Sequence, residues 1–315
     1  VRRAGKYHTY ALRALEPGAD PASETQAYTC YGMHLHFTGR REEALRMYDR
    51  SASVARETGD IKQWAVPTLL RSLMLQQVGR LREGLDLCRG ITDAGREVSD
   101  EQMAGWGLAG QGRSLLLLNE PDQAESCIEE ADRLLRLVPD HFNLVSAMTC
   151  GAMASMGRGD EERAFRILSE ARALIEQRSL GGHCVWEARF ADAELRLERL
   201  GRTPEEQRDP SPELKTAMER IRKIARSQSW YRPRYFRLRG TYQHFTRRPR
   251  RAVASWNTAL AEAKALDNRL EEGLTYLEMG KALEEPRCLE KCRPIFSELD
   301  ARYHLDQADR YLAPS

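Results

Sequence analysis

The apolar and polar positions of this chain repeat at an interval of forty residues over most of its length. In the first copy, Gly32 lies seven residues before Gly39, while Ala44 and Tyr48 lie five and nine residues after it. Three further copies place a small residue, a turn residue, a second small residue and a larger apolar residue at the same offsets: Ser72, Gly79, Gly84 and Cys88; Gly112, Asn119, Ala124 and Ile128; Ala152, Gly159, Ala164 and Leu168. A later copy keeps the spacing but not the register: Gly240, Arg247, Ala252 and Trp256.

Each position of this pattern has a physical cause. Glycine and, less often, asparagine adopt the left-handed backbone that ends a helix, so the turn residues predict the end of one helix just before the next. Small residues on both sides let two antiparallel helices approach closely, and the larger residue fills the space beside them. Because one such hairpin cannot bury its apolar face alone, hairpins must stack. The sequence therefore predicts an all-α solenoid.

The pattern predicts about seven antiparallel hairpins with a period near 40 residues. Ser99, followed by two acidic residues, is predicted to cap the third hairpin. We predict regular repeats over 22–201, an irregular proline-rich loop over 202–212, and further repeats with a C-terminal capping helix over 213–312. The expected helices are 22–38 and 41–57, 61–78 and 81–96, 101–118 and 121–137, 141–156 and 160–177, 184–200 and 213–226, 233–245 and 249–266, 269–283 and 287–299, and 305–312.

The start of the chain predicts an incomplete repeat. Residues 1–16 have the pattern of the second helix of a hairpin, and Pro17, Gly18 and Pro21 then interrupt it. The first residue is Val1 rather than methionine. We therefore expect a fragment of a longer polypeptide.

The order small, turn, small and large at these offsets resembles the tetratricopeptide repeat (TPR). The helices here are longer than those of the common repeat, which has about 34 residues in all. The resemblance covers about residues 26–301. HEAT-type repeats have a similar period but do not require these small residues, so they are the second choice. The tetratricopeptide resemblance implies a right-handed superhelix whose first helices line a concave groove.

The C-terminal segment 288–312, CLEKCRPIFSELDARYHLDQADRYL, carries a narrower resemblance. It resembles the closing segment of tetratricopeptide regions in large bacterial signalling proteins that have an ATPase module and often a nucleotide cyclase or a DNA-binding domain. This resemblance implies a cytoplasmic regulatory arm that binds a protein, a peptide or a small ligand, with the upstream ATPase, cyclase or DNA-binding domain among the candidate partners. The alternative is a free-standing scaffold or adaptor. The reading frame upstream of Val1 would discriminate between the two.

Composition excludes several classes of protein. The formal net charge is only +2, which gives no overall attraction to nucleic acid or membrane. The longest purely aliphatic run is Leu115 to Leu118, far too short to span a bilayer, and no signal peptide is visible. Seven scattered cysteines indicate reduced thiols in a cytosol rather than a disulfide framework.

The sequence also predicts a protein that is not an enzyme and needs no cofactor or metal. The segment 105–110, GWGLAG, matches the dinucleotide fingerprint, but it lies inside a helical repeat with no preceding strand, so close helix packing is the better interpretation. Cys288 and Cys292 lie one helical turn apart without an evident second pair of ligands. No set of residues typical of nucleophilic or acid–base catalysis can be assembled from spacing alone.

The tetratricopeptide resemblance implies a set of groove residues on the first helix of each hairpin. Methionine and aromatic side chains suit adaptable peptide binding, but the same residues would also suit the interior of a tight superhelix. The candidates are Met33, His36, Phe37, Leu73, Gln77, Trp106, Arg113, Met153, Arg234, Arg237, Thr241 and His244.

The segment 230–251, WYRPRYFRLRGTYQHFTRRPRR, interleaves aromatic residues with arginines. Guanidinium groups beside aromatic rings suit nucleic acid or acidic peptides, so a repeat-type nucleic-acid binder is a further alternative. The competing interpretation is that the aromatic residues belong to the solenoid core and the arginines to its solvated face. The candidate basic patch is Arg232, Arg239, Arg247, Arg248, Arg250 and Arg251.

Overall fold

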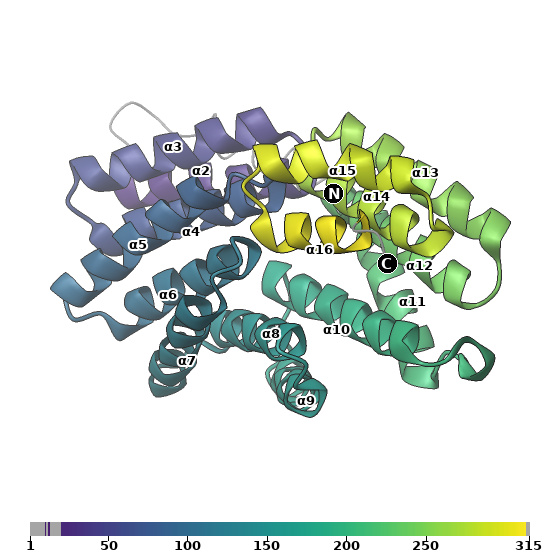
Figure 1. Ribbon diagram of the computed structural model, residues 1–315. Coiled ribbons are helices and arrows are strands. Elements are labelled where there is room, and N and C mark those ends of the chain that lie inside the picture. The colour runs from purple at the N-terminus through teal and green to yellow at the C-terminus, as the bar shows by residue number, and fades with distance from the viewer. Residues whose placement is uncertain (1–9, 11, 13–19, 313–315) are drawn as a thin grey trace.

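A computed structural model describes residues 10, 12 and 20–312 of the chain, and the regular structure within them is helical throughout (Figure 1). The predicted helix at residues 1–16 lies almost wholly outside the described residues. The α-helices are α2 (Pro21–Phe37), α3 (Arg41–Glu57), α4 (Ile61–Val78), α5 (Leu81–Glu97), α6 (Glu101–Leu117), α7 (Pro121–Leu137), α8 (His141–Gly157), α9 (Glu161–Gln177), α10 (His183–Arg202), α11 (Pro212–Ser227), α12 (Arg232–Phe245), α13 (Pro249–Ala265), α14 (Arg269–Leu283), α15 (Pro286–Glu298) and α16 (Arg302–Leu312).

The helices pair as consecutive hairpins, from α2 with α3 to α14 with α15, and α16 closes the series. The first helix of each hairpin also contacts the first helix of the next, from α2 with α4 through to α14 with α16. These first helices form one continuous layer, and the second helices form the layer outside it. The predicted all-α solenoid of stacked hairpins is confirmed.

The turn between the helices of a hairpin has the predicted geometry. Gly39, Gly79, Asn119 and Gly159 all have a positive φ, between 61° and 90°, and Arg247 adopts the same region with φ 57°. The predicted cap at Ser99 is wrong. Ser99 itself has φ 55°, and the next residue, Asp100, is the cap, whose carboxylate accepts a hydrogen bond from the Met103 backbone N–H at 2.9 Å.

The small residues of the repeat lie directly against the large ones, as the spacing predicts. A Cβ atom added to Gly32 would lie 2.7 Å from the Tyr48 ring, and one added to Gly240 would lie 2.4 Å from the Trp256 ring. The three glycines of the segment 105–110 are packed in the same way. A Cβ on Gly107 would lie 2.5 Å from the Cys88 carbonyl oxygen, so this segment is a helix face that allows α5 and α7 to approach α6.

Replacing Gly112 by alanine is expected to lower the free energy of unfolding by about 1–3 kcal/mol, the usual range for overpacking a core. The added Cβ would lie 2.4 Å from Ile128 Cγ1, so one helix of the hairpin must shift. Gly157→Ala is the matched control, because the nearest atom to its added Cβ is 4.0 Å away. Urea unfolding of both variants checks this, and equal stabilities would contradict it.

The solenoid curls until its two ends touch. The C-terminal helices α14 and α16 contact α4 and α6, respectively, and Figure 1 shows the yellow end of the chain beside the blue helices. Arg41 pairs with Asp267 at 2.6 Å, and Asn119 donates to Asp306 at 2.7 Å. Leu299 covers the turn at Gly79. Residues more than 180 positions apart in the sequence therefore hold the superhelix closed.

The segment predicted as an irregular loop over 202–212 connects α10 to α11. Arg202 still belongs to α10, Pro212 already begins α11, and Glu205–Gln207 form a single 3-10 turn between them. Arg208 folds back over this loop and donates to the carbonyl oxygens of Thr203 and Gly201. The extra residues therefore remain a surface connection within one continuous stack of helices.

Candidate functional site

The first helices bring six of the predicted groove residues into one hydrogen-bonded network on the inner layer. They come from α2, α4, α6 and α12: His36, Gln77, Arg113, Arg234, Arg237 and Thr241, whose hydroxyl donates to the Arg237 carbonyl oxygen. Glutamates on α10 and α14, which the sequence analysis did not single out, join Gln77 and the three arginines to one another.

Glu187 on α10 is the hub of this network, with only 7% of its surface exposed. Its Oε1 accepts from Gln77 Nε2 at 3.1 Å and from the Tyr231 hydroxyl at 3.0 Å. Its Oε2 accepts from Arg234 Nη1 at 2.8 Å and from Arg113 Nη2 at 3.4 Å. One carboxylate therefore connects α4, α6, α10 and α12, which belong to four different hairpins.

The network continues along the inner layer towards α14. Arg234 makes a two-point contact with Glu194, through Nε at 3.0 Å and Nη2 at 2.6 Å. Arg237 Nη2 donates to Glu194 Oε1 at 2.7 Å, and Arg237 Nε donates to Glu271 Oε2 at 2.8 Å. The result is a row of alternating charges, Arg113–Glu187–Arg234–Glu194–Arg237–Glu271, which we call the inner ladder.

The charges of the inner ladder balance, three arginines against three glutamates. Burial alone would raise the pKa of Glu187, but Arg113 and Arg234 outweigh burial and lower that pKa to about 2. Arg234 and Arg237 likewise outweigh burial at Glu194 and lower its pKa to about 2. Both glutamates therefore stay ionised at neutral pH, and the arginines keep their partners.

At the α2 end, the network connects to an aromatic cluster. His36 is fully buried, and its Nε2 donates to Gln77 Oε1 at 2.7 Å. Its ring stacks on Phe37 with centroids 4.5 Å apart, and the edge of Trp230 lies against it at 5.7 Å. Burial lowers the pKa of His36 to about 4, so this imidazole is neutral.

The other predicted groove residues lie apart from the inner ladder. Trp106 is buried, and its indole N–H donates to Asp140 at 2.5 Å. His244 lies tilted against the Trp256 ring with centroids 6.1 Å apart. Met153 is 37% exposed, whereas Met33 and Leu73 are half-buried.

The arginine and aromatic segment 230–251 divides into three groups. Trp230, Tyr231 and Tyr235 are buried in the core, and three further aromatics pack against them half-buried. Arg234 and Arg237 turn inwards to the glutamates of the inner ladder. The six arginines of the predicted basic patch are all exposed; among them Arg232 pairs with Glu262 at 2.5 Å.

The residues that sequence analysis missed are Glu187, Glu194, Glu271 and Tyr231. Glu187 lies between apolar neighbours in a helix that is otherwise rich in core residues, and Glu194 follows two helical turns later on the same face. Charged residues at core positions, facing an arginine pair three residues apart at Arg234 and Arg237, are the signal that could have indicated an ion network.

Over 20–312, no group of three or more histidine, cysteine and acidic side chains is placed so that it could hold a metal ion. No helix in that range combines the length and apolar character that crossing a bilayer requires. All seven cysteines are free thiols, and Cys292 Sγ donates to the Leu289 carbonyl oxygen at 3.2 Å.

Comparison with known proteins identifies the fold. No protein-family model and no curated protein matches the chain. Among solved structures, the apo form of RapI superposes with a TM-score of 0.56 at 10% identity, over 84% of this chain and 90% of that one. A Signal Transduction ATPase with Numerous Domains from Pyrococcus horikoshii, which has a tetratricopeptide-repeat sensor, superposes with a TM-score of 0.53 at 16% identity, over 95% of this chain and 43% of that one. The fold is a TPR-like solenoid.

Proposed function

We propose that this chain is a non-catalytic interaction and sensor module, the regulatory arm of a larger cytoplasmic signalling protein. The observation that carries the proposal is the inner ladder, because its members come from α6, α10, α12 and α14, and Gln77 extends it to α4. A ligand that takes one charge of the ladder changes the contacts between hairpins. Such a ligand binds one shape of the superhelix better than another and so shifts the population between them.

The fold supports the same proposal. The Pyrococcus horikoshii protein has its repeats as a sensor within a longer ATPase chain, and this chain spans 43% of that structure. We propose that the ligand is a protein or peptide segment with charged side chains, and that an ATPase, a cyclase or a DNA-binding domain is regulated by it. The predicted groove residues Arg113, Arg234 and Arg237 would meet the ligand, with Arg113 the most accessible of them at 23% side-chain exposure.

Arg113→Ala is expected to weaken partner binding at least tenfold, which corresponds to about 1.4 kcal/mol. The 315-residue chain is used as bait in cell lysate in raised salt, and bound proteins are identified by mass spectrometry. The partner is then purified and titrated against both forms. Arg166→Ala, an exposed arginine on α9, is the matched control and should bind as the unchanged chain does.

Two results would contradict this function. One is a partner that binds the Arg113→Ala variant as tightly as the unchanged chain. The other is recovery of nucleic acid alone, lost as salt rises. If the reading frame upstream of Val1 encodes no further module and the partner still binds the repeats, that result would favour the free-standing scaffold.

A second candidate function is nucleic-acid binding, favoured by the exposed arginines that flank the turn between α12 and α13. Arg248, Arg250 and Arg251 have no ion-pair partner within the described residues. Binding of this kind would fall steeply with salt, because it releases counterions from the phosphates. It would also be lost on replacing these three arginines by alanine, whereas Arg113→Ala would leave it unchanged.

A further inference from the structure

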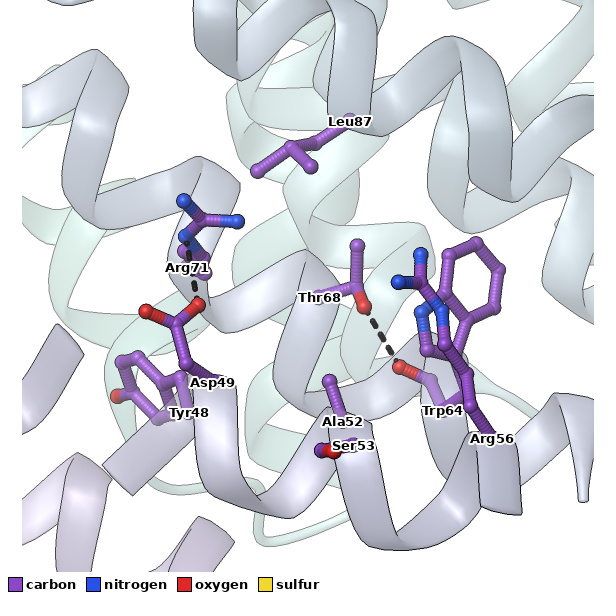
Figure 2. A pocket seen from close by; sticks show the side chains of 9 residues that line it. All are labelled: Tyr48, Asp49, Ala52, Ser53, Arg56, Trp64, Thr68, Arg71 and Leu87. Carbon is purple, nitrogen blue, oxygen red and sulfur yellow. Dashed lines mark hydrogen bonds and ion pairs between the residues drawn. The ribbon is translucent and has the colours of Figure 1, made fainter. Parts of the chain in front are cut away.

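A cleft of about 280 Å³ lies between α3, α4 and α5, and Figure 2 shows the side chains that line it. It is separate from the inner ladder. Thr68 lines the cleft, and Gln77 of the network lies nine residues further along α4, which places the two side chains on opposite faces of that helix. The cleft therefore opens on the outer layer.

One end of the cleft presents both signs of charge. Arg71 Nε lies 3.2 Å from Asp49 Oδ1, and the two side chains are 34% and 55% exposed. Arg71 Nε is buried without a hydrogen-bond partner, and within the described part of the chain the Nη groups of Arg71 donate to no side chain or carbonyl group, so they are available to a ligand. Asp49 likewise keeps a second carboxylate oxygen that can accept.

The remaining walls combine aromatic, aliphatic and polar side chains. The Arg56 guanidinium lies 5.2 Å from the centroid of the Trp64 ring, and Figure 2 shows this stacked pair on the opposite side of the cleft from Arg71. Tyr48, Ala52, Ser53 and Leu87 complete the lining. Thr68 is buried between the two sides, and its hydroxyl is turned towards its own helix, where it donates to the Trp64 carbonyl oxygen at 2.7 Å (Figure 2).

We propose that this cleft binds a free α-amino acid with an apolar side chain. The Arg71 guanidinium receives the carboxylate, because a planar pair of N–H donors matches two carboxylate oxygens. Asp49 receives the ammonium group, and the apolar side chain lies against Trp64 and Leu87. The volume is just below the usual range of about 300–1,000 Å³ for ligand pockets, which suits a single amino acid. Asp49 disfavours a phosphate dianion in the same position.

This inference goes beyond the proposed function and does not rest on it, since the cleft shares no residue with the inner ladder. Titration calorimetry on the 315-residue chain tests it with L-phenylalanine and L-leucine as probes. Two analogues of L-phenylalanine isolate the charges: phenylacetate lacks the ammonium group, and phenethylamine lacks the carboxylate. We expect at least one of the two amino acids to bind. If L-phenylalanine binds, each of its two analogues should bind at least tenfold more weakly than L-phenylalanine itself.

Three variants sharpen the test. Arg71→Gln is expected to weaken binding at least tenfold, and Ala52→Phe, which fills the cleft from α3, is expected to abolish it. Arg46→Gln, an exposed arginine on α3 that does not line the cleft, should bind unchanged. The proposal is overturned by the absence of heat from both amino acids at millimolar concentration, by unchanged binding to Arg71→Gln, or by phenylacetate binding as tightly as L-phenylalanine.

Discussion

Replacing Glu187 by alanine is expected to lower the free energy of unfolding by about 3–5 kcal/mol, the usual cost of removing one partner from a buried ion pair. The substitution leaves Arg234 buried with one carboxylate instead of two, and it removes the acceptor of Gln77 and Tyr231. The buried donors left without an acceptor and the unbalanced charge of three arginines against two glutamates, more than the loss of the attraction itself, set this magnitude. Urea unfolding followed by circular dichroism measures the difference.

The matched control is Glu176→Ala, on the exposed surface of α9. This substitution removes a carboxylate that lies in solvent rather than in the core, so we expect the free energy of unfolding to change by no more than about 0.5 kcal/mol. If Glu187→Ala were as stable as the control, the inner ladder would contribute little to the fold. That result would also remove its role as a link between hairpins.

Acidification from pH 6.5 to pH 4 is expected to destabilise the chain, with His36 contributing up to about 3 kcal/mol. Burial lowers the pKa of His36 from 6.5 to about 4, so the folded state holds this ring neutral while the unfolded chain takes up a proton. The stabilisation is therefore complete above pH 6.5 and is lost as the pH falls towards 4. Burial likewise lowers the pKa of His183 to about 4 and that of His304 to about 3.

Glu187 and Glu194 contribute in a lower pH window. Their pKa values fall from 4.5 in the unfolded chain to about 2 in the folded one, so their stabilisation is present above pH 4.5 and is lost towards pH 2. Urea unfolding at a series of pH values, with His36→Leu as the comparison, separates the two windows. Between pH 4 and pH 6.5, the dependence of the free energy of unfolding on pH should be about 1.4 kcal/mol per pH unit less steep in the variant. An unchanged slope would show that His36 takes up no proton on unfolding.

The hairpins could be predicted from the sequence because their information is local. Gly32 and Tyr48 are sixteen residues apart in one hairpin, and their contact follows from two helices and one turn. The left-handed turn residues are equally local. The prediction failed at Ser99 because serine favours capping positions, whereas here it occupies the left-handed turn and Asp100 is the cap.

The inner ladder could be predicted only in part, because its partners lie in different hairpins. The resemblance placed Arg113 and Arg234 on the inner face, yet nothing in the spacing pairs Arg113 with Glu187, 74 residues away. The contact between Arg41 and Asp267, 226 residues apart, depends on how far the superhelix curls. Curvature is the sum of small rotations from one repeat to the next, so a sequence pattern does not determine these pairs.

The inner ladder is expected to couple helices that are far apart in the sequence, and hydrogen exchange measures this coupling directly. Glu187→Gln keeps the size of the side chain but removes its charge. Compared with the unchanged chain and with Glu176→Gln, we predict faster amide exchange in α4, α6 and α12 as well as in α10, because Glu187 contacts side chains from all of these helices or from the turn before α12. Faster exchange confined to α10 would contradict the role of the inner ladder as a link between hairpins.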